Sequence, residues 1–301
     1  MSESTAGLRR KIASSSDLQS VVRTMKALAA SNIGQYEKSV LALGEYYRTV
    51  ELGLGACLRR LGRESLREHE PRDAAVLGVV VFGSDQGLVG QFNEVVVEFA
   101  VETLAARTSS VRLWAVGERA HARLVDAGLS PEPPLLVPNS VQAVAPLVIQ
   151  LLMQSEALHD EGHIDELHVF YNRPTAGAGY APTTRRLLPL DHRWLRGLLE
   201  VPWPTDKIAE VLGDSQATLH ALTHEFLFIS LFRACAESLA SENASRLAAM
   251  QRADKNIDEL LEHLRESFHR LRQSGIDEEL FDVVSGFEAL SVHTNRDPAN
   301  P

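Results

Sequence analysis

Proline is distributed very unevenly along this chain of 301 residues. Eleven of the thirteen prolines lie between Pro71 and Pro204, and the other two come near the C-terminus. Residues 1–70 and 205–297 contain none. A proline inside a helix costs about 3 kcal/mol, so these two stretches are the parts of the chain that permit long helices.

Apolar residues in the first stretch recur at steps of three and four, which is close to a heptad seam. The stripe consists of Leu18, Val22, Met25, Ala29, Ile33, Tyr36, Val40, Leu43, Tyr47, Val50, Leu54, Cys57 and Leu61. This pattern predicts a helix that enters a left-handed coiled coil. Glycines at 44, 53, 55 and 62 weaken its later part, so we expect the helix to end near residue 60.

The second proline-free stretch carries a similar stripe from Leu222 to Leu290. At 1.5 Å per residue, a helix from about 214 to 290 reaches roughly 110 Å, and the N-terminal helix roughly 75 Å. No compact domain of this size can enclose the longer helix. We therefore expect its seam to pack against the N-terminal helix, with the excess length projecting alone or into a partner protein.

The middle of the chain alternates apolar β-branched runs with helical patterns. The expected strands are 75–82, 111–116 and 166–171, and the expected helices are 94–106, 118–127 and 141–156. Such alternation predicts βαβ units around a small parallel, Rossmann-like sheet. Residues 172–204 contain several prolines and glycines and predict a loop-rich return to the final helix. The fold class is thus two long helices with an α/β domain inserted between them.

Composition excludes several classes of function. The formal net charge of −10 argues against a protein that mainly grips nucleic acid or anionic lipid. The two cysteines, Cys57 and Cys235, have no neighbours at metal-ligand spacing, which indicates a reduced cytosolic setting. The sequence shows no signal peptide, and we expect no run long enough to cross a bilayer, which needs about 20 apolar residues. We therefore predict no direct membrane insertion.

A glycine-rich segment, Ser84–Asn93, follows the first expected strand and opens the first helix of the middle region. A turn in this place could cradle a phosphate at the helix N-terminus. However, it lacks the Lys followed by Ser or Thr of a Walker loop, and its glycines do not fit the dinucleotide spacing. A tight strand-to-helix turn, capped by Asp85 or Ser84, is the favoured interpretation, and we predict no bound cofactor.

Histidines offer no better site. His220 and His224 form an i, i+4 pair, but two ligands are fewer than a stable zinc site needs. No third ligand is evident in the sequence, and no nucleophile, base and oxyanion set stands out. We predict no metal site and no catalytic residues.

Three segments resemble the γ subunit of F-type ATP synthases. The first runs from Leu8 to Ser14 and continues with Met25-Lys26-Ala27-Leu28-Ala29-Ala30-Ser31, and the second is Ser84-Asp85-Gln86-Gly87-Leu88-Val89-Gly90 with Asn93. The third runs from Glu237 to Met250 and on through Arg272-Gln273 to Val284-Ser285-Gly286. The resemblance covers residues 8 to 290 in the family's order.

This resemblance implies an antiparallel coiled coil of the terminal helices beside a Rossmann-like domain. It divides the chain into a shaft helix (1–62), an α/β domain (72–205), a second shaft helix (210–290) and a tail (291–301). It implies a non-catalytic rotor that works inside a ring of α and β subunits and meets the ε subunit and the membrane rotor ring of c subunits. Its location would be the cytoplasmic face of the bacterial inner membrane.

The resemblance also assigns roles to residues. Arg272 and Gln273 would meet a loop of the β subunit, and Met25 and Arg246 would lie by the β segment that transmits torque. Met25 also fits the apolar seam, and Arg246 and Gln273 also fit plain exposed helix positions. A separate set would form the conformational turn of the α/β domain: Ser84, Asp85, Gly87, Gly90 and Asn93.

Several positions depart from the family pattern. Asp277 stands where a small hydroxyl residue is usual, Leu247 replaces a Met, and Asn243 replaces a His or Gln. These departures fit a divergent, second-copy complex that hydrolyses ATP to pump ions. Two rival classes of protein also stay open. A non-rotary coiled-coil adaptor would form a homodimer alone, and a small nucleotide-dependent enzyme would bind ligand through the central domain.

Overall fold

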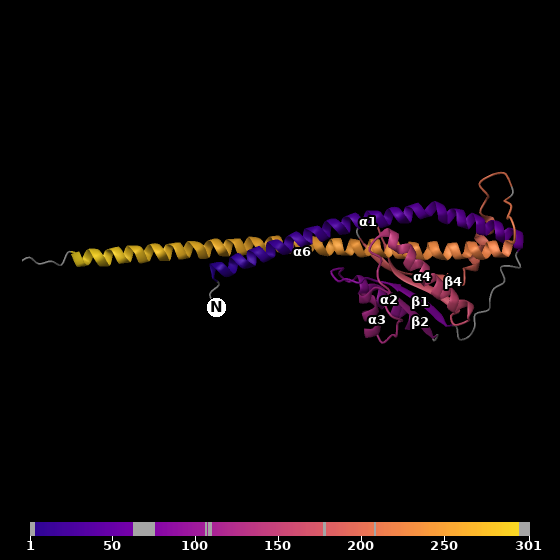
Figure 1. Cartoon of the computed structure of the whole chain (residues 1–301), viewed down its shortest axis with the longest axis horizontal. Helices are drawn as coiled ribbons and strands as arrows, with labels where there is room; N and C mark the ends of the chain where they lie inside the picture. Colours follow the sequence, from indigo (N-terminus) through magenta and orange to yellow (C-terminus); the bar gives the residue numbers. More distant parts are fainter. Residues whose placement is uncertain are drawn as a thin grey trace, which may run out of the picture. The chain divides into compact units, whose positions relative to one another are not determined.

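The computed structural model describes residues 4–62, 76–105, 107, 110–176, 179–207 and 209–294, with residues 287–294 described through their backbone alone. Its elements, labelled in Figure 1, are α1 (Thr5–Leu61), β1 (Leu77–Phe82), α2 (Phe92–Ala105), β2 (Val111–Val116), α3 (Glu118–Asp126), α4 (Val141–Asp160), β3 (Glu166–Pro174), β4 (Tyr180–Leu188), α5 (His192–Glu200) and α6 (Ser215–Thr294). The two long terminal helices and the alternating middle region are therefore confirmed.

Contacts group the chain into two compact units. Unit 1 comprises residues 1–26 and 250–301, and unit 2 comprises residues 27–249. Each long helix contributes to both units. The predicted division is by sequence segments, whereas the two units are defined by contacts. It therefore stays a prediction for the segments 1–62, 72–205, 210–290 and 291–301.

Unit 2 contains a four-stranded sheet in the order β2-β1-β3-β4. Strands β1, β2 and β3 are parallel, as the βαβ pattern predicts, and β4 pairs antiparallel with β3. The expectation of a loop-rich return over residues 172–204 was wrong, because this segment contains β4 and α5. β4 is an edge strand whose side chains are mostly half-exposed, so it lacks the continuous apolar run of a buried strand.

The sheet separates two apolar layers. Val79 and Val81 of β1 face a layer formed with α2 and α3, which includes Val96, Ala100 and Leu124. On the opposite face, β1 contributes Val80 and Phe82 to a larger core shared with α1, α4, α5 and α6. Successive residues of a strand point to opposite faces, so one continuous apolar run supplies both layers.

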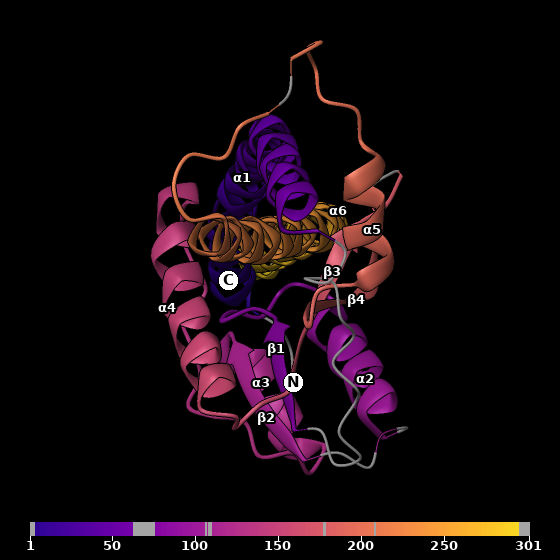
Figure 2. The ribbon, with the colours of Figure 1, turned by 90° about the vertical axis from the view of Figure 1, so that its right-hand side faces the viewer.

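Helix α6 lies inside this larger core instead of along its edge. Between Phe226 and Asn243 every side chain is buried, except for the half-buried Phe228 and Arg233. Figure 2 shows the cause: α1, α4, α5 and strands β3 and β4 surround the helix. The expected single seam thus describes this part of α6 incompletely, because an enclosed helix buries side chains on every face, here including polar ones such as Glu237, Ser241 and Glu242.

Helix α4 has the length and composition of a membrane-spanning helix, so the expectation that no run approaches that length was wrong. No other described helix meets both criteria. Its Val144, Val148 and Leu152 are fully buried in the core that α6 shares. A core helix of a folded domain passes the same test of length and composition, and α4 buries one face in this way while its Ile149 and Met153 are exposed.

Unit 1 pairs the start of α1 with α6 in antiparallel fashion. The guanidinium of Arg9 lies 5.2 Å from the ring centroid of Phe268, and further along Arg23 Nε and Lys26 Nζ lie 3.1 and 2.6 Å from the carboxylate of Asp254. The Lys26 hydrogen bond is the main cause that lowers the pKa of Asp254. Val22 is buried as the heptad pattern predicts, but Leu18 is 54% exposed and lies outside the seam.

Candidate functional site

The segment after β1 turns sharply where the chain passes close to α3. A Cβ on Gly83 would lie 2.2 Å from Ala120 Cβ and 2.8 Å from Asn93 Oδ1. Atoms at such distances overlap, so only glycine fits without moving the backbone. This close approach brings the end of β1 against the starts of α2 and α3.

Ser84 and Asn93 hold the two ends of the turn together. The Ser84 backbone N–H donates to Asn93 Oδ1 at 2.9 Å, and Asn93 Nδ2 donates to Ser84 Oγ at 2.8 Å. The Ser84 hydroxyl donates onward to the Gln86 carbonyl oxygen at 2.9 Å. Both residues are buried, so these bonds satisfy groups that would otherwise be costly to remove from water.

Asp85 joins three segments of the α/β domain. Its Oδ1 accepts a hydrogen bond from the Glu118 N–H at 3.1 Å, and its Oδ2 accepts one from the Val137 N–H at 2.9 Å. Asp85 therefore caps the first turn of α3 instead of the helix that follows it in the chain, so the predicted cap on α2 was wrong. A carboxylate at the start of a helix also interacts favourably with the helix dipole.

The tip of the turn combines a strained residue with an exposed apolar side chain. Leu88 has a φ of 63° and is 61% exposed, whereas the adjacent Val89 is buried. Gly90 also has a positive φ, of 58°, which glycine adopts without strain. Gly87 lies outside the left-handed region, and a Cβ there would meet nothing within 4 Å.

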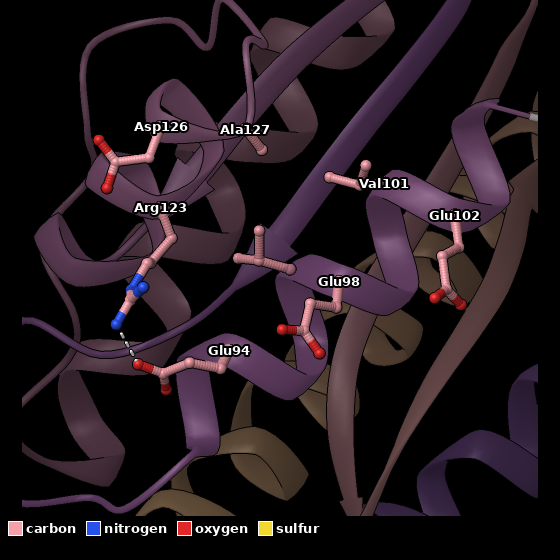
Figure 3. A pocket seen from close by; sticks show the side chains of 8 residues that line it. Glu94, Glu98, Val101, Glu102, Arg123, Asp126 and Ala127 are labelled. Carbon is pink, nitrogen blue, oxygen red and sulfur yellow. Dashed lines mark hydrogen bonds and ion pairs between the residues drawn. The ribbon is translucent and has the colours of Figure 1, made fainter.

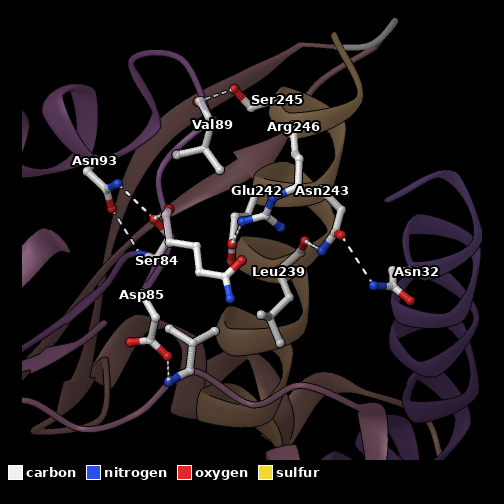
Figure 4. A network of polar contacts seen from close by, with 12 residues as sticks. Asn32, Ser84, Asp85, Val89, Asn93, Leu239, Glu242, Asn243, Ser245 and Arg246 are labelled. Atoms are coloured by element: carbon white, nitrogen blue, oxygen red, sulfur yellow. Dashed lines mark hydrogen bonds and ion pairs between the residues drawn. The ribbon is translucent and has the colours of Figure 1, made fainter. Parts of the chain in front are cut away.

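Helix α6 closes the site from the other side (Figure 4). The Ser245 hydroxyl donates to the Val89 carbonyl oxygen, and Arg246 Nη2 lies 2.6 Å from Glu242 Oε1. The Glu242 side chain is only 6% exposed, and that of Arg246 is 14% exposed. Burial raises the pKa of Glu242, Arg246 opposes that rise, and Asp85 adds to it.

Helix α1 reaches the same stretch of α6. Asn32 Nδ2 donates to Asn243 Oδ1 at 3.4 Å, and Asn243 Nδ2 donates to the Leu239 carbonyl oxygen at 2.8 Å. Burial, with a smaller contribution from Glu242, raises the pKa of Tyr36 to about 12. Asn243, one of the departures from the family pattern, therefore forms hydrogen bonds within this chain, to α1 and along α6.

The structure brings together only part of the predicted site. Ser84, Asp85 and Asn93 lie in the network with Arg246 (Figure 4). Met25 is half-buried in unit 1, and Arg272 and Gln273 are exposed on α6 in the same unit. Their contacts with other subunits stay predictions.

Sequence reasoning missed Glu242, Ser245 and Tyr36 as members of the network. The i, i+4 spacing of Glu242 and Arg246 is a signal for a helical ion pair that was available in the sequence. No pattern of neighbouring residues indicates that Ser245 or Tyr36 joins the network. The hydrogen-bond partner of Ser245, Val89, lies 156 residues away, and Tyr36 belongs to a different helix, α1.

The histidine pair on α6 has a neighbour that the sequence did not reveal. Glu156 Oε2 of α4 lies 3.4 Å from His224 Nε2. Among the residues that the structure describes, however, no three His, Cys, Asp or Glu side chains gather closely enough to hold a metal ion.

Two long antiparallel helices and a small mixed sheet make up a fold that this chain shares with solved structures. One is the rotor of the Euglena gracilis mitochondrial ATP synthase in rotational state 1, with a TM-score of 0.60, 15% identity, and coverage of 90% of this chain and 98% of that one. A structure of the same organism's OSCP/F1/c-ring in rotational state 3 has a TM-score of 0.62, 16% identity, and coverage of 99% and 98%.

Sequence comparison is more specific than the fold. The family model described as ATP synthase matches residues 4–290, so the chain belongs to the ATP synthase family. A relative named ATP synthase gamma chain, from Moorella thermoacetica, is 27% identical over 94% of this chain and 98% of its own length. Another of that name, from Granulibacter bethesdensis, is 29% identical over 95% and 99%.

Proposed function

We propose that the chain is the central-stalk rotor subunit, the γ subunit, of an F-type ATP synthase. Its partners are the α and β subunits of the catalytic ring, the ε subunit and the ring of c subunits. The full-length match to relatives named ATP synthase gamma chain supports this assignment, and so does the fold shared with rotor and central-stalk structures. These matches favour neither the non-rotary adaptor nor the second-copy ion pump.

The observation that carries the proposal is the exposed apolar surface of α6 beyond Arg272. Phe281 is 71% exposed and Val283 is 72% exposed, and Ile276, Leu280 and Val284 are exposed as well. At 100° per residue these five side chains spread over about 160° of the helix circumference. That band is wider than a coiled-coil seam, and its exposure leaves it available to partner subunits.

A single asymmetric helix inside a threefold ring couples rotation to catalysis by differential contact. At each angle, every β subunit meets a different face of the rotor, so each catalytic site is biased separately. The chain itself supplies no reacting group in this mechanism and is a non-catalytic subunit of the complex. The contacts assigned to it are Met25 and Arg246 with the torque-transmitting β segment, and Arg272 and Gln273 with a β loop.

The turn formed by Ser84, Asp85, Gly87, Gly90 and Asn93 positions the tip residue Leu88 in this mechanism. Strained, exposed residues persist only where the surrounding structure fixes them. The bonds of Ser84, Asp85 and Asn93 supply that support, and Ser245 ties the turn to the shaft helix. Arg246 exposes a small part of its side chain beside the same turn.

The complex is placed at the cytoplasmic face of a bacterial inner membrane, with this chain as a peripheral component. The bacterial origin of the two gamma-chain relatives supports this location.

Co-expression with the α and β subunits of the same organism tests the assignment. Native mass spectrometry is expected to find one copy of this chain with three α and three β subunits. The variant Phe281→Asp/Val284→Asp is expected to lower the yield of that complex, whereas the apolar control Phe281→Leu/Val284→Ile preserves it. A stable homodimer that never joins the other subunits would instead support the adaptor.

A further inference from the structure

A shallow groove lies between α2 and α3 (Figure 3), and no residue of the network around Ser84 lines it. Its volume is about 410 Å³, which falls within the range of ligand-binding clefts. Val97, Val101 and Ala127 contribute apolar surface, and the remaining lining residues are all charged: Glu94, Glu98, Glu102, Arg123 and Asp126.

The charges of the groove are unbalanced. Arg123 Nη2 pairs with Glu94 Oε1 across the two helices and neutralises one carboxylate. The side chains of Glu98, Glu102 and Asp126 have no hydrogen bond or ion pair with any residue that the structure describes. The groove therefore presents three exposed carboxylates around apolar side chains.

This arrangement costs stability in the free chain. Glu98 and Glu102 stand at i, i+4 spacing along α2, and like charges at that spacing destabilise a helix. Val101 is at the same time only half-buried. A partner that brought positive charge and apolar surface together would relieve both costs.

We propose that the groove is a docking site for a cationic amphipathic helix of another protein. A third helix lying along α2 and α3 would place apolar side chains against Val101 and Ala127. Lys or Arg residues at i, i+4 spacing on that helix would face Glu98 and Glu102, which share the same spacing, and a residue on its other edge would face Asp126. A second copy of this chain does not fit as occupant, because its net charge of −10 opposes such pairing.

The test uses the full-length chain and a fluorescent helical peptide of about 16 residues, long enough to span the groove, that carries an apolar stripe flanked by arginines at i, i+4 spacing. Fluorescence anisotropy measures its affinity at low ionic strength. The groove variant Glu98→Gln/Glu102→Gln/Asp126→Asn is expected to bind about tenfold more weakly, since three exposed ion pairs are lost. Circular dichroism checks that each variant keeps its helix content.

The matched control Glu200→Gln/Asp206→Asn/Glu210→Gln removes the same charges from positions elsewhere in unit 2. It is expected to bind within about twofold of the unchanged chain, because electrostatic effects on an exposed surface are local. Equal weakening by both variants would show general attraction to an acidic protein and would overturn the proposal.

The variant Val101→Ser tests whether the groove binds a helix through apolar contact or binds any small polycation through charge alone. The substitution is expected to weaken peptide binding about threefold by removing apolar contact, and it leaves the charges unchanged. If spermine binds with the same dependence on the three carboxylates and Val101→Ser has no effect on the peptide, the groove binds small polycations and the proposal fails. Both measurements use the isolated chain, so their outcome is independent of whether the chain assembles with α and β subunits.

Discussion

At the scale of single residues, Gly87 and Gly90 stand in the same turn but meet different demands. Gly90 has a φ of 58°, in the left-handed region, whereas Gly87 has neither such a φ nor a neighbour within 4 Å of a Cβ. The family resemblance assigns both glycines to the same turn. Their backbone conformations show that only Gly90 requires a glycine.

Gly90→Ala is therefore expected to lower the free energy of unfolding by about 1–2 kcal/mol, the cost of a left-handed L-residue. Gly87→Ala is expected to change it by less than about 0.5 kcal/mol. Urea unfolding followed by circular dichroism measures both. Similar losses for the two variants would contradict the different roles assigned to these glycines.

Glu242 is the buried acid of the network, and its raised pKa makes stability depend on pH. A carboxyl group whose pKa is raised by folding binds its proton more tightly in the folded state. Its contribution to stability is full below the ordinary value of 4.5 and is lost as the pH rises through the raised value.

Glu242→Gln keeps the shape of the side chain and removes this titration. The melting temperature of the variant relative to that of the unchanged chain is expected to rise as the pH increases above about 4.5. Arg246→Ala is expected to act in the opposite direction, because it leaves the Glu242 charge buried without its partner. A difference between Glu242→Gln and the unchanged chain that stays flat with pH would show that Glu242 does not titrate in this range.

At the scale of elements, α6 behaves as two different helices along one continuous backbone. Leu231 is fully buried within the larger core, whereas Val283 is exposed in unit 1. Both are apolar positions of a long helical pattern. Their surroundings, which come from other segments, give them different roles.

Leu231→Ala is expected to lower the free energy of unfolding of the isolated chain by about 2–5 kcal/mol, through lost burial and the cavity left behind. Val283→Ala is expected to change it by less than about 0.5 kcal/mol. Thermal unfolding of the isolated chain distinguishes them. A large loss with Val283→Ala would mean that this part of α6 packs within the chain and is not available to a ring of partners.

The same contrast shows what the sequence could predict about the elements. Strand β1 was predicted from its apolar run, and the long helices from their spacing and lack of proline. Strand β4 was missed because an edge strand with half-exposed side chains carries no strong pattern and contains Pro182. Leu18 was assigned to the seam by spacing, but the partner helix leaves it in solvent.

At the scale of the whole molecule, Arg272 and Gln273 test whether exposed residues of unit 1 act in the assembled motor. Arg272→Ala/Gln273→Ala is expected to lower coupled ATPase turnover of the complex while the isolated chain keeps its thermal stability, since both side chains are exposed. Turnover equal to that of the unchanged complex would remove the two residues from the proposed contacts with the β subunit.

The sequence by itself determined the two long helices, the parallel strands between them and the family, because local periodicity, proline placement and ordered motifs are properties of neighbouring residues. The tertiary structure alone decided that residues 226–243 of α6 are enclosed, that Asp85 caps α3, and that Glu242 and Ser245 join the turn near Ser84. Those features depend on contacts between segments far apart in the chain, and burial and hydrogen bonding at such contacts follow from the three-dimensional arrangement.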